Sequence, residues 1–429
     1  MSTRAHPVGC IADDITGAVD LASAIAGYGL DARLSFGSAE LSADSVDSAD
    51  AVVVALKIRS VPAAEARAAA VRAATALHGV GARRFFSKYC STFDSTPEGN
   101  IGPIADALSD ALGAARVVHS PSYPANGRTV YLGHLFVGAE LLSDSPMRDH
   151  PLNPMRDARL QRVLAEQTPR PVEILTLPAV EAGAAAVGHG LEEIAGRHTE
   201  PHHVIVDAIR DADLTTIAEA AADDVLAAGA AAFGAAFTAA ARRQARRGAS
   251  RDAPGGSRRA ALPPGPTAIL AGSLSRATRE QVRRFDGAIL TLAIDELIDG
   301  EAALRRAREF AGDRLLGGPV LIATDPDAGG RSASLTATPG EVSRRIESTM
   351  GRIARELEQL GTRRLIIAGG ETSGAVAEAL GLGSARIGPD IAVGVPWIVA
   401  DDRPLAVAFK SGNFGGPAFF RDALEVAGR

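Results

Sequence analysis

Short apolar runs alternate with longer alanine-rich stretches along most of the chain. The run VGCIA (8–12) is typical of a buried strand, and residues 16–29 after it have helical character; the same pair recurs at 50–57 and 63–79. Repeated strand–helix units of this kind predict a mainly parallel sheet covered by helices on both faces. Further strands are expected at 83–89, 115–120, 172–177 and 202–208 and, later in the chain, at 267–273, 286–292, 318–324, 363–370 and 405–410.

The alternation stops at residues 242–266, a stretch that contains seven arginines together with Gly-Gly and Pro-Pro pairs. Two interpretations are open: a basic patch for nucleic acid or membrane, or a solvated linker between domains. No aromatic residue lies among the arginines, and Pro- and Gly-rich polar stretches mark domain boundaries, so we favour the linker. The expected fold class is α/β, with two α/β domains of mainly parallel sheet at 1–245 and 262–429, joined by this Arg/Gly/Pro-rich linker.

The composition is that of an ordinary globular protein. The chain has 429 residues, of which 46% are hydrophobic and 22% charged, a formal net charge of −6 and two cysteines. Two thiols make no disulfide framework, and no apolar run is long enough for a signal peptide or a membrane span. We expect a cytoplasmic protein without a membrane partner, and the negative charge argues against nucleic acid as the partner. The nine histidines show no metal-ligand spacing and are expected to be structural or exposed.

Two neighbouring carboxylates, Asp13 and Asp14, stand where the first expected strand ends and a helix begins. Ligands of open α/β sheets bind at the carboxyl ends of the strands. Such a pair is suited to holding Mg²⁺, to accepting a hydroxyl proton or to binding substrate hydroxyls, whereas a single Asp here would more often cap the helix. Both interpretations remain open on the sequence alone.

A second polar cluster follows the strand at 83–89. Residues 88–100 (KYCSTFDSTPEGN) place a lysine, carboxylates and hydroxyls at one strand end, and these are the groups that a polyhydroxy acid requires. Arg59, after the strand at 50–57, is a candidate for a second contact to a substrate carboxylate, although a lone arginine is more often solvated. The loop 121–129 is best interpreted as an ordinary rigid turn.

In the C-terminal half, three loops rich in small residues follow expected strands: 271–275, 369–374 and 410–416. A glycine turn that leads into a helix N-terminus, here expected at about Ser373, binds phosphate through backbone N–H groups. Neither the GxxxxGK nor the GxGxxG fingerprint is present, so an ordinary tight turn is the alternative. Strand ends along one sheet edge would bring the three loops together and favour a nucleotide site.

Five motifs of the chain match one known family. ADDITGA, KYCSTFDSTPEGNIGP, PANGRTVYLGHLFVG, AGGETSGAV and KSGNFGG, in this order, resemble the four-carbon acid sugar kinase family over most of the chain, and most closely its 3-oxo-tetronate kinase branch. The resemblance implies an N-terminal domain that binds the sugar acid, a C-terminal domain that binds ATP with Mg²⁺, and phosphoryl transfer to the C4 hydroxyl.

The resemblance also implies which residues form the two sites. The expected catalytic residues are Asp13 and Asp14, and the expected substrate contacts are Arg59, Lys88, Asp94, Ser95 and Thr96. The expected ATP contacts are Ser273, Ser275, Gly369, Gly370, Glu371, Thr372, Ser373, Gly374, Lys410 and Gly412.

Two alternatives remain. A threonate or erythronate 4-kinase is the nearer one, although the wording CSTFDSTPEGN favours the 3-oxo-tetronate branch. The family usually has a Gly-Ser-Gly turn near the end of its first domain, where this chain has AAGAAAFG (227–234) without a serine. That departure supports the other alternative, a non-catalytic ligand-binding or regulatory protein. The expected partners are therefore small molecules, and homo-oligomerisation is left open.

Overall fold

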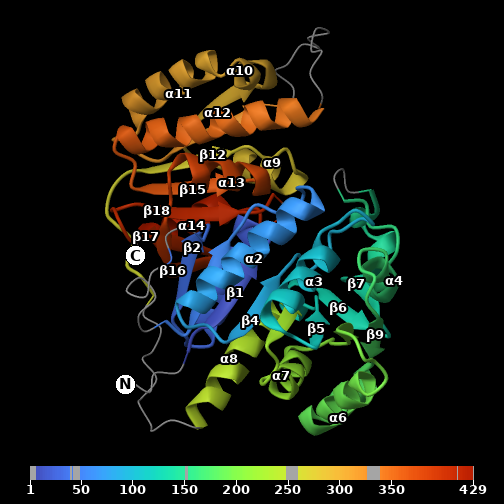
Figure 1. The fold of residues 1–429 in the computed structure, drawn as a ribbon. Helices are drawn as coiled ribbons and strands as arrows, with labels where there is room; N and C mark the ends of the chain where they lie inside the picture. The colour runs from blue at the N-terminus through green and yellow to red at the C-terminus, as the bar shows by residue number, and fades with distance from the viewer. Residues whose placement is uncertain are drawn as a thin grey trace. The chain divides into compact units, whose positions relative to one another are not determined.

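The computed structural model describes residues 6–38, 41, 49–149, 153–247, 259–325, 339–412 and 414–428. The chain divides into two compact units, Met1–Arg258 and Arg259–Arg429. Each unit has helices and a sheet of mainly parallel strands (Figure 1), which confirms the expected fold class. The centre of the expected linker, 248–258, lies outside the described residues.

The first unit is built on a parallel sheet with strand order β2-β3-β1-β4-β11-β5-β10-β9. Its register places five strand ends in one row, because Ala12 pairs with Ala55 and Lys88, and Gly229 pairs with Lys88 and Ser120. The loops that follow these strands therefore leave from one edge. The strands are β1 (Val8–Ala12), β2 (Ala32–Phe36), β3 (Ala51–Ala55), β4 (Arg84–Lys88), β5 (Arg116–Ser120), β9 (Val172–Leu175), β10 (His202–Val206) and β11 (Leu226–Gly229).

Helices cover both faces of this sheet because neighbouring strand residues point to opposite sides. Phe85 belongs to the core beneath α2 and α3, which lie side by side in Figure 1, whereas the ring of Phe86 packs against Phe233 of α8 at 5.8 Å. On that second face α8 contacts α1 and α7. The helices are α1 (Ile15–Gly27), α2 (Ala63–Gly79), α3 (Ile101–Leu112), α4 (Leu160–Ala165), α5 (Leu177–Glu181), α6 (Ala184–Ala195), α7 (Asp211–Ala220) and α8 (Ala231–Arg247).

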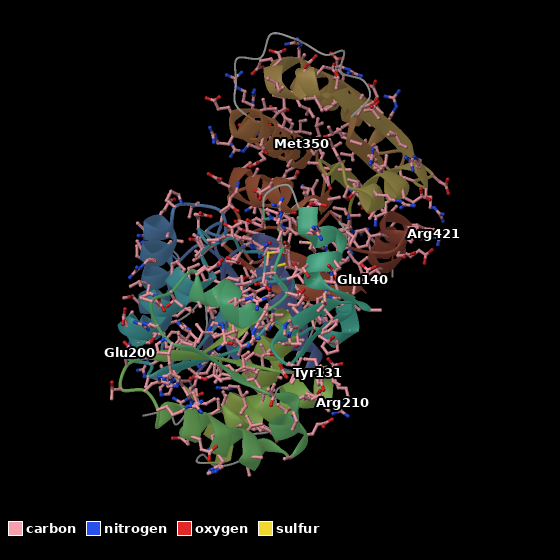
Figure 2. The ribbon with its side chains drawn as sticks, turned by 90° about the vertical axis from the view of Figure 1, so that its right-hand side faces the viewer. Tyr131, Glu140, Glu200, Arg210, Met350 and Arg421 are labelled. Carbon is pink, nitrogen blue, oxygen red and sulfur yellow. The ribbon has the colours of Figure 1, made fainter. Side chains whose placement is uncertain are left out.

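A small antiparallel sheet, which the sequence pattern did not predict, follows β5. It consists of β6 (Arg128–Tyr131), β7 (His134–Val137) and β8 (Glu140–Leu141). Tyr131 and Glu140, labelled in Figure 2, are exposed on it. These strands, of four, four and two residues, are too short to show the apolar pattern of a buried strand.

The second unit has strand order β13-β14-β12-β15-β18-β17-β16, in which the first five strands are parallel and β17 is antiparallel to both neighbours. Helices α12 and α13 pack together, and α13 contacts β15. Apolar residues of α14 form a hydrophobic core with residues of β17. The strands are β12 (Thr267–Ala271), β13 (Ala288–Ala293), β14 (Val320–Asp325), β15 (Arg364–Ala368), β16 (Ser384–Ala392), β17 (Val395–Ala400) and β18 (Ala406–Lys410). The helices are α9 (Arg276–Arg283), α10 (Ile294–Asp299), α11 (Glu301–Arg314), α12 (Pro339–Gln359), α13 (Gly370–Ala379) and α14 (Phe419–Gly428). No helix within the described ranges is long and apolar enough to cross a membrane.

The arginine-rich stretch begins inside helix α8 and not in a linker. Arg242 is 8% exposed, and its guanidinium donates to the Asp50 carboxylate (Nε–Oδ1 2.8 Å) and to the carbonyl oxygen of His6 (2.9 Å). The expectation of a solvated stretch from residue 242 onward was therefore wrong for this residue. A long-range partner makes an arginine part of the core, and the sequence does not show that partner.

Arg242→Ala should lower the free energy of unfolding of the first unit by about 3–5 kcal/mol, because it leaves the buried Asp50 carboxylate without its cation. Arg243→Ala is the matched control: its side chain is 50% exposed and pairs with Glu219, so its loss should cost less than about 1 kcal/mol. Calorimetry on the full chain measures both variants. Equal effects of the two substitutions would show that the Arg242–Asp50 pair has no special role.

Candidate active site

The centre of the candidate site in the first unit is a guanidinium shared by two carboxylates. Arg59 Nε donates to Asp13 Oδ2 at 2.8 Å, and Nη2 donates to Asp13 Oδ1 and Asp14 Oδ1, both at 2.7 Å. The two carboxylates follow β1, and Arg59 lies in the loop after the neighbouring β3. Parallel strands thus bring together residues that are far apart in sequence, as the strand-end argument predicts.

Asp14 also caps helix α1. Its Oδ1 accepts from Gly17 N at 3.0 Å and its Oδ2 accepts from the Thr16 hydroxyl at 2.5 Å. Burial is outweighed by Arg59, Lys88 and these hydrogen bonds, which together lower the pKa of Asp14. The structure therefore confirms the helix cap and places the same carboxylate in the charged cluster, while its role toward a ligand stays a prediction.

Asp13 differs from its neighbour in its proton affinity. Its side chain is buried, and burial raises its pKa above the ordinary value, although Arg59 acts in the opposite direction. Arg59 in turn stays charged, because the two carboxylates raise its pKa against the effect of burial. The cluster thus contains one carboxylate that is held ionised and one that takes up a proton more readily.

Lys88 brings a second cation to the cluster from the end of β4. It is 4% exposed and its ammonium donates to the Tyr89 carbonyl oxygen at 2.8 Å. A Cβ on Gly17 would lie 2.8 Å from the Lys88 ammonium and 2.3 Å from Asp14 Oδ1, so this position in α1 has no room for a side chain. The glycine of the DDITG motif therefore leaves room for the Asp14 carboxylate, which lies nearer, and for the lysine ammonium.

Asp20 is a buried carboxylate of this cluster that sequence reasoning missed. It lies on α1, is 8% exposed and accepts a hydrogen bond from the Tyr123 hydroxyl at 3.0 Å. Burial raises its pKa to about 6, although Lys88 favours the charged form. The signal was an aspartate six residues after Asp14 on an otherwise apolar helix face. The loop 121–129, interpreted as a plain turn, is thus tied to the site through Tyr123.

The loop that carries Arg59 is fixed by Asn100, at the start of α3. The Asn100 side-chain amide donates to the carbonyl oxygens of Ile58 (2.9 Å), Arg59 (3.2 Å) and Val61 (2.8 Å). Three bonds from one buried amide fix the backbone of the arginine and hence the position of its guanidinium. The asparagine that ends the KYCSTFDSTPEGN motif is therefore a positioning residue.

The three remaining predicted substrate contacts differ in exposure. Asp94 is partly buried and accepts from the Thr92 hydroxyl at 2.5 Å, and Thr96 donates to Glu98 at 3.2 Å. Ser95 is 4% exposed and its hydroxyl accepts from the Gln167 amide at 2.7 Å. Ser95 thus anchors the loop to the protein interior, whereas Asp94 and Thr96 are more accessible.

In the second unit, the three small-residue loops meet at the ends of β12, β15 and β18. Ser273 N donates to the carbonyl oxygen of Ala368 (3.0 Å), and Gly369 N donates to that of Lys410 (2.8 Å). The Ser275 hydroxyl donates to the carbonyl oxygen of Gly412 (2.7 Å). A Cβ on Gly412 would lie 2.5 Å from the Ser273 hydroxyl, so close packing of the loops requires this glycine.

The GGETSG turn starts a helix earlier than expected. Helix α13 begins at Gly370, with Gly369 as its N-cap at φ +139°, and not at about Ser373. Ser373 is fully buried and donates to the Gly369 carbonyl oxygen at 2.7 Å, so its hydroxyl is used within the helix. Glu371 is exposed in the first turn, while Thr372 and Gly374 are buried. The free amides of a helix N-terminus therefore lie at Gly370 and the residues after it.

Lys410 does not present its charge to the surface of these loops. It is fully buried, and its ammonium donates to the Thr278 hydroxyl (3.2 Å) and to the carbonyl oxygens of Ser411 (3.0 Å) and Gly412 (2.9 Å). Burial lowers its pKa to about 7. The sequence suggested a direct contact to phosphate; the structure uses this lysine to hold the loop 411–412.

Helix α9 supplies two loop-binding residues that sequence reasoning missed. The Thr278 hydroxyl donates to the Gly412 carbonyl oxygen (2.9 Å), and the Gln281 amide donates to those of Phe414, Gly415 and Gly416 (3.0–3.2 Å). Both side chains are 1% exposed. Their spacing of three residues on an otherwise charged helix was the signal available in the sequence.

Comparison with known proteins finds two family models, one in each half of the chain. A sugar-binding N-terminal domain matches residues 8–237 and a nucleotide-binding C-terminal domain matches 268–420. A 3-oxo-tetronate kinase of Cupriavidus necator is 43% identical over 99% of both chains, and one of Methylobacterium radiotolerans is 42% identical over 98% of this chain and 99% of its own. The chain belongs to the four-carbon acid sugar kinase family.

Two solved structures resemble the chain closely. A Haemophilus influenzae protein has a TM-score of 0.76 and 35% identity, over 98% of this chain and 100% of its own. A Salmonella typhimurium protein, described as a putative tRNA synthase, has a TM-score of 0.83 and 33% identity, over 97% and 98%. The family fold therefore extends over nearly the whole chain.

The turn in which this family member lacks a serine lies beside Lys88. Tyr89 N donates to the carbonyl oxygen of Gly229, and Ala230 N donates to that of Ser120, both at 3.1 Å. A Cβ on Gly229 would lie 2.2 Å from the Ser120 carbonyl oxygen. The turn thus contributes backbone contacts and a glycine that close packing requires, while its alanines offer no hydroxyl to a ligand.

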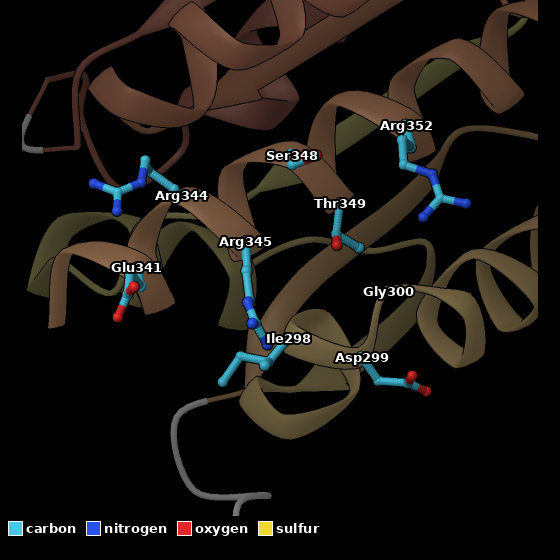
Figure 3. A pocket seen from close by; sticks show the side chains of 9 residues that line it. All are labelled: Ile298, Asp299, Gly300, Glu341, Arg344, Arg345, Ser348, Thr349 and Arg352. Carbon is cyan, nitrogen blue, oxygen red and sulfur yellow. The ribbon is translucent and has the colours of Figure 1, made fainter. Parts of the chain in front are cut away.

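An open hollow of about 430 Å³ in the second unit lies outside these loops, between the end of α10 and α12. Arg344, Arg345 and Arg352 line it, but Figure 3 shows their guanidinium groups pointing in different directions. Arg352 is paired with Glu301 at 2.6 Å. Because the three cations do not converge, the hollow lacks the geometry of an anion site.

Asp20→Asn should stabilise the ligand-free protein at neutral pH. Because the carboxyl has a pKa of about 6 in the fold and 3.8 ordinarily, its ionisation lowers the stability of the native chain as pH rises from 4 to 6, and the variant lacks this contribution. The stability difference between variant and native chain should grow over that window by about 3 kcal/mol at most and stay constant above it. Calorimetry at a series of pH values measures it, with Asp313→Asn, 79% exposed, as the control. A difference that does not change with pH would contradict the assignment.

Proposed function

We propose that this chain is an ATP-dependent kinase that phosphorylates the C4 hydroxyl of a four-carbon sugar acid, 3-oxo-tetronate in the first place, yielding the 4-phosphate. The observation that carries the proposal is the cluster of Asp13, Asp14, Arg59 and Lys88 at the strand ends of the first unit. It combines cations for a carboxylate with carboxylates for hydroxyls, in the domain whose family description is sugar-binding.

The sugar acid would be recognised by charge and by hydroxyl contacts. Arg59 uses Nε and Nη2 on the two aspartates and makes no hydrogen bond through Nη1 to any residue that the structure describes. We assign Nη1 and the Lys88 ammonium to the substrate carboxylate, and Asp94 and Thr96 to its hydroxyls. Ser95 would act through the loop, because its hydroxyl is already bonded to Gln167.

Asp13 is the better candidate for the general base. Burial raises the pKa of Asp13, whereas that of Asp14 is lowered. A base is most effective when its pKa lies near the working pH, so Asp13 would accept the C4 hydroxyl proton while Asp14 keeps Arg59 and the start of α1 in place.

ATP would bind at the three loops of the second unit. The N-terminus of α13 offers backbone N–H groups to phosphate oxygens, and Ser273, Ser275 and Gly412 form the neighbouring loop surface. We propose that Lys410 acts by holding that surface and not by contacting phosphate.

Mg²⁺ would neutralise the triphosphate and would be bound mainly by phosphate oxygens and water. Within the described part of the chain, no group of three His, Cys, Asp or Glu side chains is arranged to hold a metal ion. Asp13 and Asp14 already share the Arg59 cation, so they fit a metal poorly. Glu371, in the first turn of α13, is the carboxylate within the GGETSG sequence that could reach such an ion.

The ADP assay described in the next paragraph also distinguishes this kinase from the alternative functions. A threonate or erythronate 4-kinase would use the same cluster, and a regulatory protein would bind ligands without turnover. A tRNA synthase, the description of the Salmonella relative, agrees poorly with a net charge of −6. We also propose that the protein works in the cytoplasm, where ATP is available.

The purified chain should produce ADP from Mg-ATP in the presence of a 3-oxo-tetronate, with a kcat/KM at least about tenfold above that for threonate or erythronate, a difference of 1.4 kcal/mol in transition-state binding. Asp13→Asn should abolish turnover while binding of the acid, measured by calorimetry, survives. Faster turnover of threonate or erythronate would reassign the substrate. Binding of both ligands without any ADP would replace the kinase by the regulatory protein.

Gly370→Val tests the ATP loop. A Cβ at Gly370 meets no atom within 4 Å, so the ligand-free variant should fold and melt like the native chain. If phosphate approaches this helix N-terminus, the valine should weaken ATP binding at least about tenfold and leave binding of the acid unchanged. Gly312→Val, at an equally open helical position of α11, is the matched control. Normal ATP affinity of the folded Gly370→Val protein would rule out this phosphate site.

A further inference from the structure

Four buried side chains form a row of hydrogen-bonding contacts in the first unit, next to the loop 90–96 that we assign to the substrate. Tyr89 Oη lies 3.3 Å from His119 Nδ1, His119 Nε2 lies 3.0 Å from His203 Nδ1, and His203 Nε2 lies 2.9 Å from Asp106 Oδ1. The two histidines are fully buried, and Tyr89 and Asp106 are 3% and 6% exposed. The members come from the end of β4, from β5, from β10 and from α3.

The acidic end sets the direction of these hydrogen bonds. Burial opposes the charge of Asp106, but hydrogen bonds from His203 and Thr168 lower its pKa below the ordinary value, so it is a carboxylate and only accepts. His203 must then donate from Nε2. Its Nδ1 accepts from His119 Nε2, and His119 Nδ1 accepts from the Tyr89 hydroxyl. Every proton in the row has an acceptor when both rings are neutral Nε2–H tautomers.

The opposite direction would leave a buried proton without an acceptor. If His119 carried its proton on Nδ1, that N–H would point at Tyr89 Oη, and the hydroxyl proton could no longer be donated to it. Burial raises the pKa of Tyr89 well above its ordinary value, so the hydroxyl keeps its proton. Burial also lowers the pKa of His119 well below its ordinary value, in accord with a neutral ring. An unmade bond of this kind costs about 1–3 kcal/mol.

Tyr89 connects this row to the charged cluster. Its carbonyl oxygen accepts from the Lys88 ammonium at 2.8 Å, and its ring packs edge-on against Phe93, with the ring centroids 5.2 Å apart. Phe93 has φ +52°, an uncommon conformation for a residue with a side chain, and is fully buried. Tyr89 therefore fixes both the lysine and the turn that starts the substrate loop.

We propose that Tyr89, His119, His203 and Asp106 form a positioning network in which the direction set at Asp106 orients Tyr89, and through it Lys88 and the loop 90–96. The kinetic part of this inference rests on the proposed function. The positions of the two imidazole protons and the rigidity of the loop do not depend on it.

Asp106→Asn is the informative substitution because it reverses the network without changing its shape. The Asn amide N–H would donate to His203 Nε2, His203 Nδ1–H to His119 Nε2, and His119 Nδ1–H to Tyr89 Oη, while the Asn oxygen still accepts from Thr168. Asp110→Asn is the matched control. Arg170 pairs with Asp106 at 3.5 Å and with Asp110 at 2.5 Å. Asp110 lies on the same helix as Asp106 and its side chain is 61% exposed, but no hydrogen bond or ion pair in the described part of the chain joins it to the two histidines.

Three measurements on the full-length protein test the network. Nitrogen-15 NMR of the histidine rings at neutral pH should report Nε2–H tautomers for His119 and His203 in the native chain and in Asp110→Asn, and Nδ1–H tautomers in Asp106→Asn. Hydrogen exchange at the Tyr89 and Phe93 amides should be about tenfold faster in Asp106→Asn, the size expected for one unmade buried hydrogen bond. The KM for the sugar acid should rise by a similar factor, while the KM for ATP and kcat stay within about twofold.

The outcomes separate this inference from the proposed function. Nδ1–H tautomers in the native chain would overturn the direction derived above. Reversed tautomers with unchanged exchange and unchanged KM would show that the network only fills the core. If the native chain turns over no acid, the kinase proposal fails, and the tautomer and exchange results still decide the network.

Discussion

The charged site of the first unit depends on one guanidinium placed between two successive carboxylates. Asp13 and Asp14 follow a buried strand, where two ionised groups side by side would repel each other strongly. Arg59 removes that repulsion by binding both, and the Ile58 amide donates to the Asp13 carbonyl oxygen at 2.9 Å, which ties the arginine loop to the strand end. Three further features surround Arg59 and its two carboxylates: the helix cap at Asp14, the ammonium of Lys88 and the hydrogen bonds of Asn100.

The three carboxylates near this guanidinium differ in proton affinity. Burial raises the pKa of Asp13 and of Asp20, while Arg59 opposes this effect at Asp13 and Lys88 opposes it at both. Asp14 receives the most hydrogen bonds and has a lowered pKa, whereas the pKa of Asp20 rises to about 6. Groups whose pKa values are pushed apart in one site are suited to different roles, here a structural anion beside proton acceptors.

In the second unit, three backbone turns lie close together. Small residues permit the contact, since a Cβ on Gly272 would lie 2.3 Å from the Thr372 hydroxyl. Carbonyl oxygens that point into this packing need donors, and Lys410, Thr278 and Gln281 supply them from inside. The lysine charge is thereby removed from water, which lowers its pKa to about 7. Ligand recognition at such a surface would rely on backbone N–H groups more than on side-chain charge.

The sequence by itself determined the strand–helix alternation, the mainly parallel sheets and the polar loops that follow the strands, because these depend on local apolar periodicity and on turn residues. It did not determine which groups pair. Arg59 and Asp13 are 46 residues apart and His203 and Asp106 are 97 apart. The register of parallel strands brought the first pair together, and the packing of α3 on the sheet brought the second pair together. Contacts between distant segments also decided the burial of Arg242 and Lys410, the role of Asp20 and the start of α13. The charge and hydrogen-bonding state of a side chain depend on neighbours from distant strands, and tertiary structure alone supplies those neighbours.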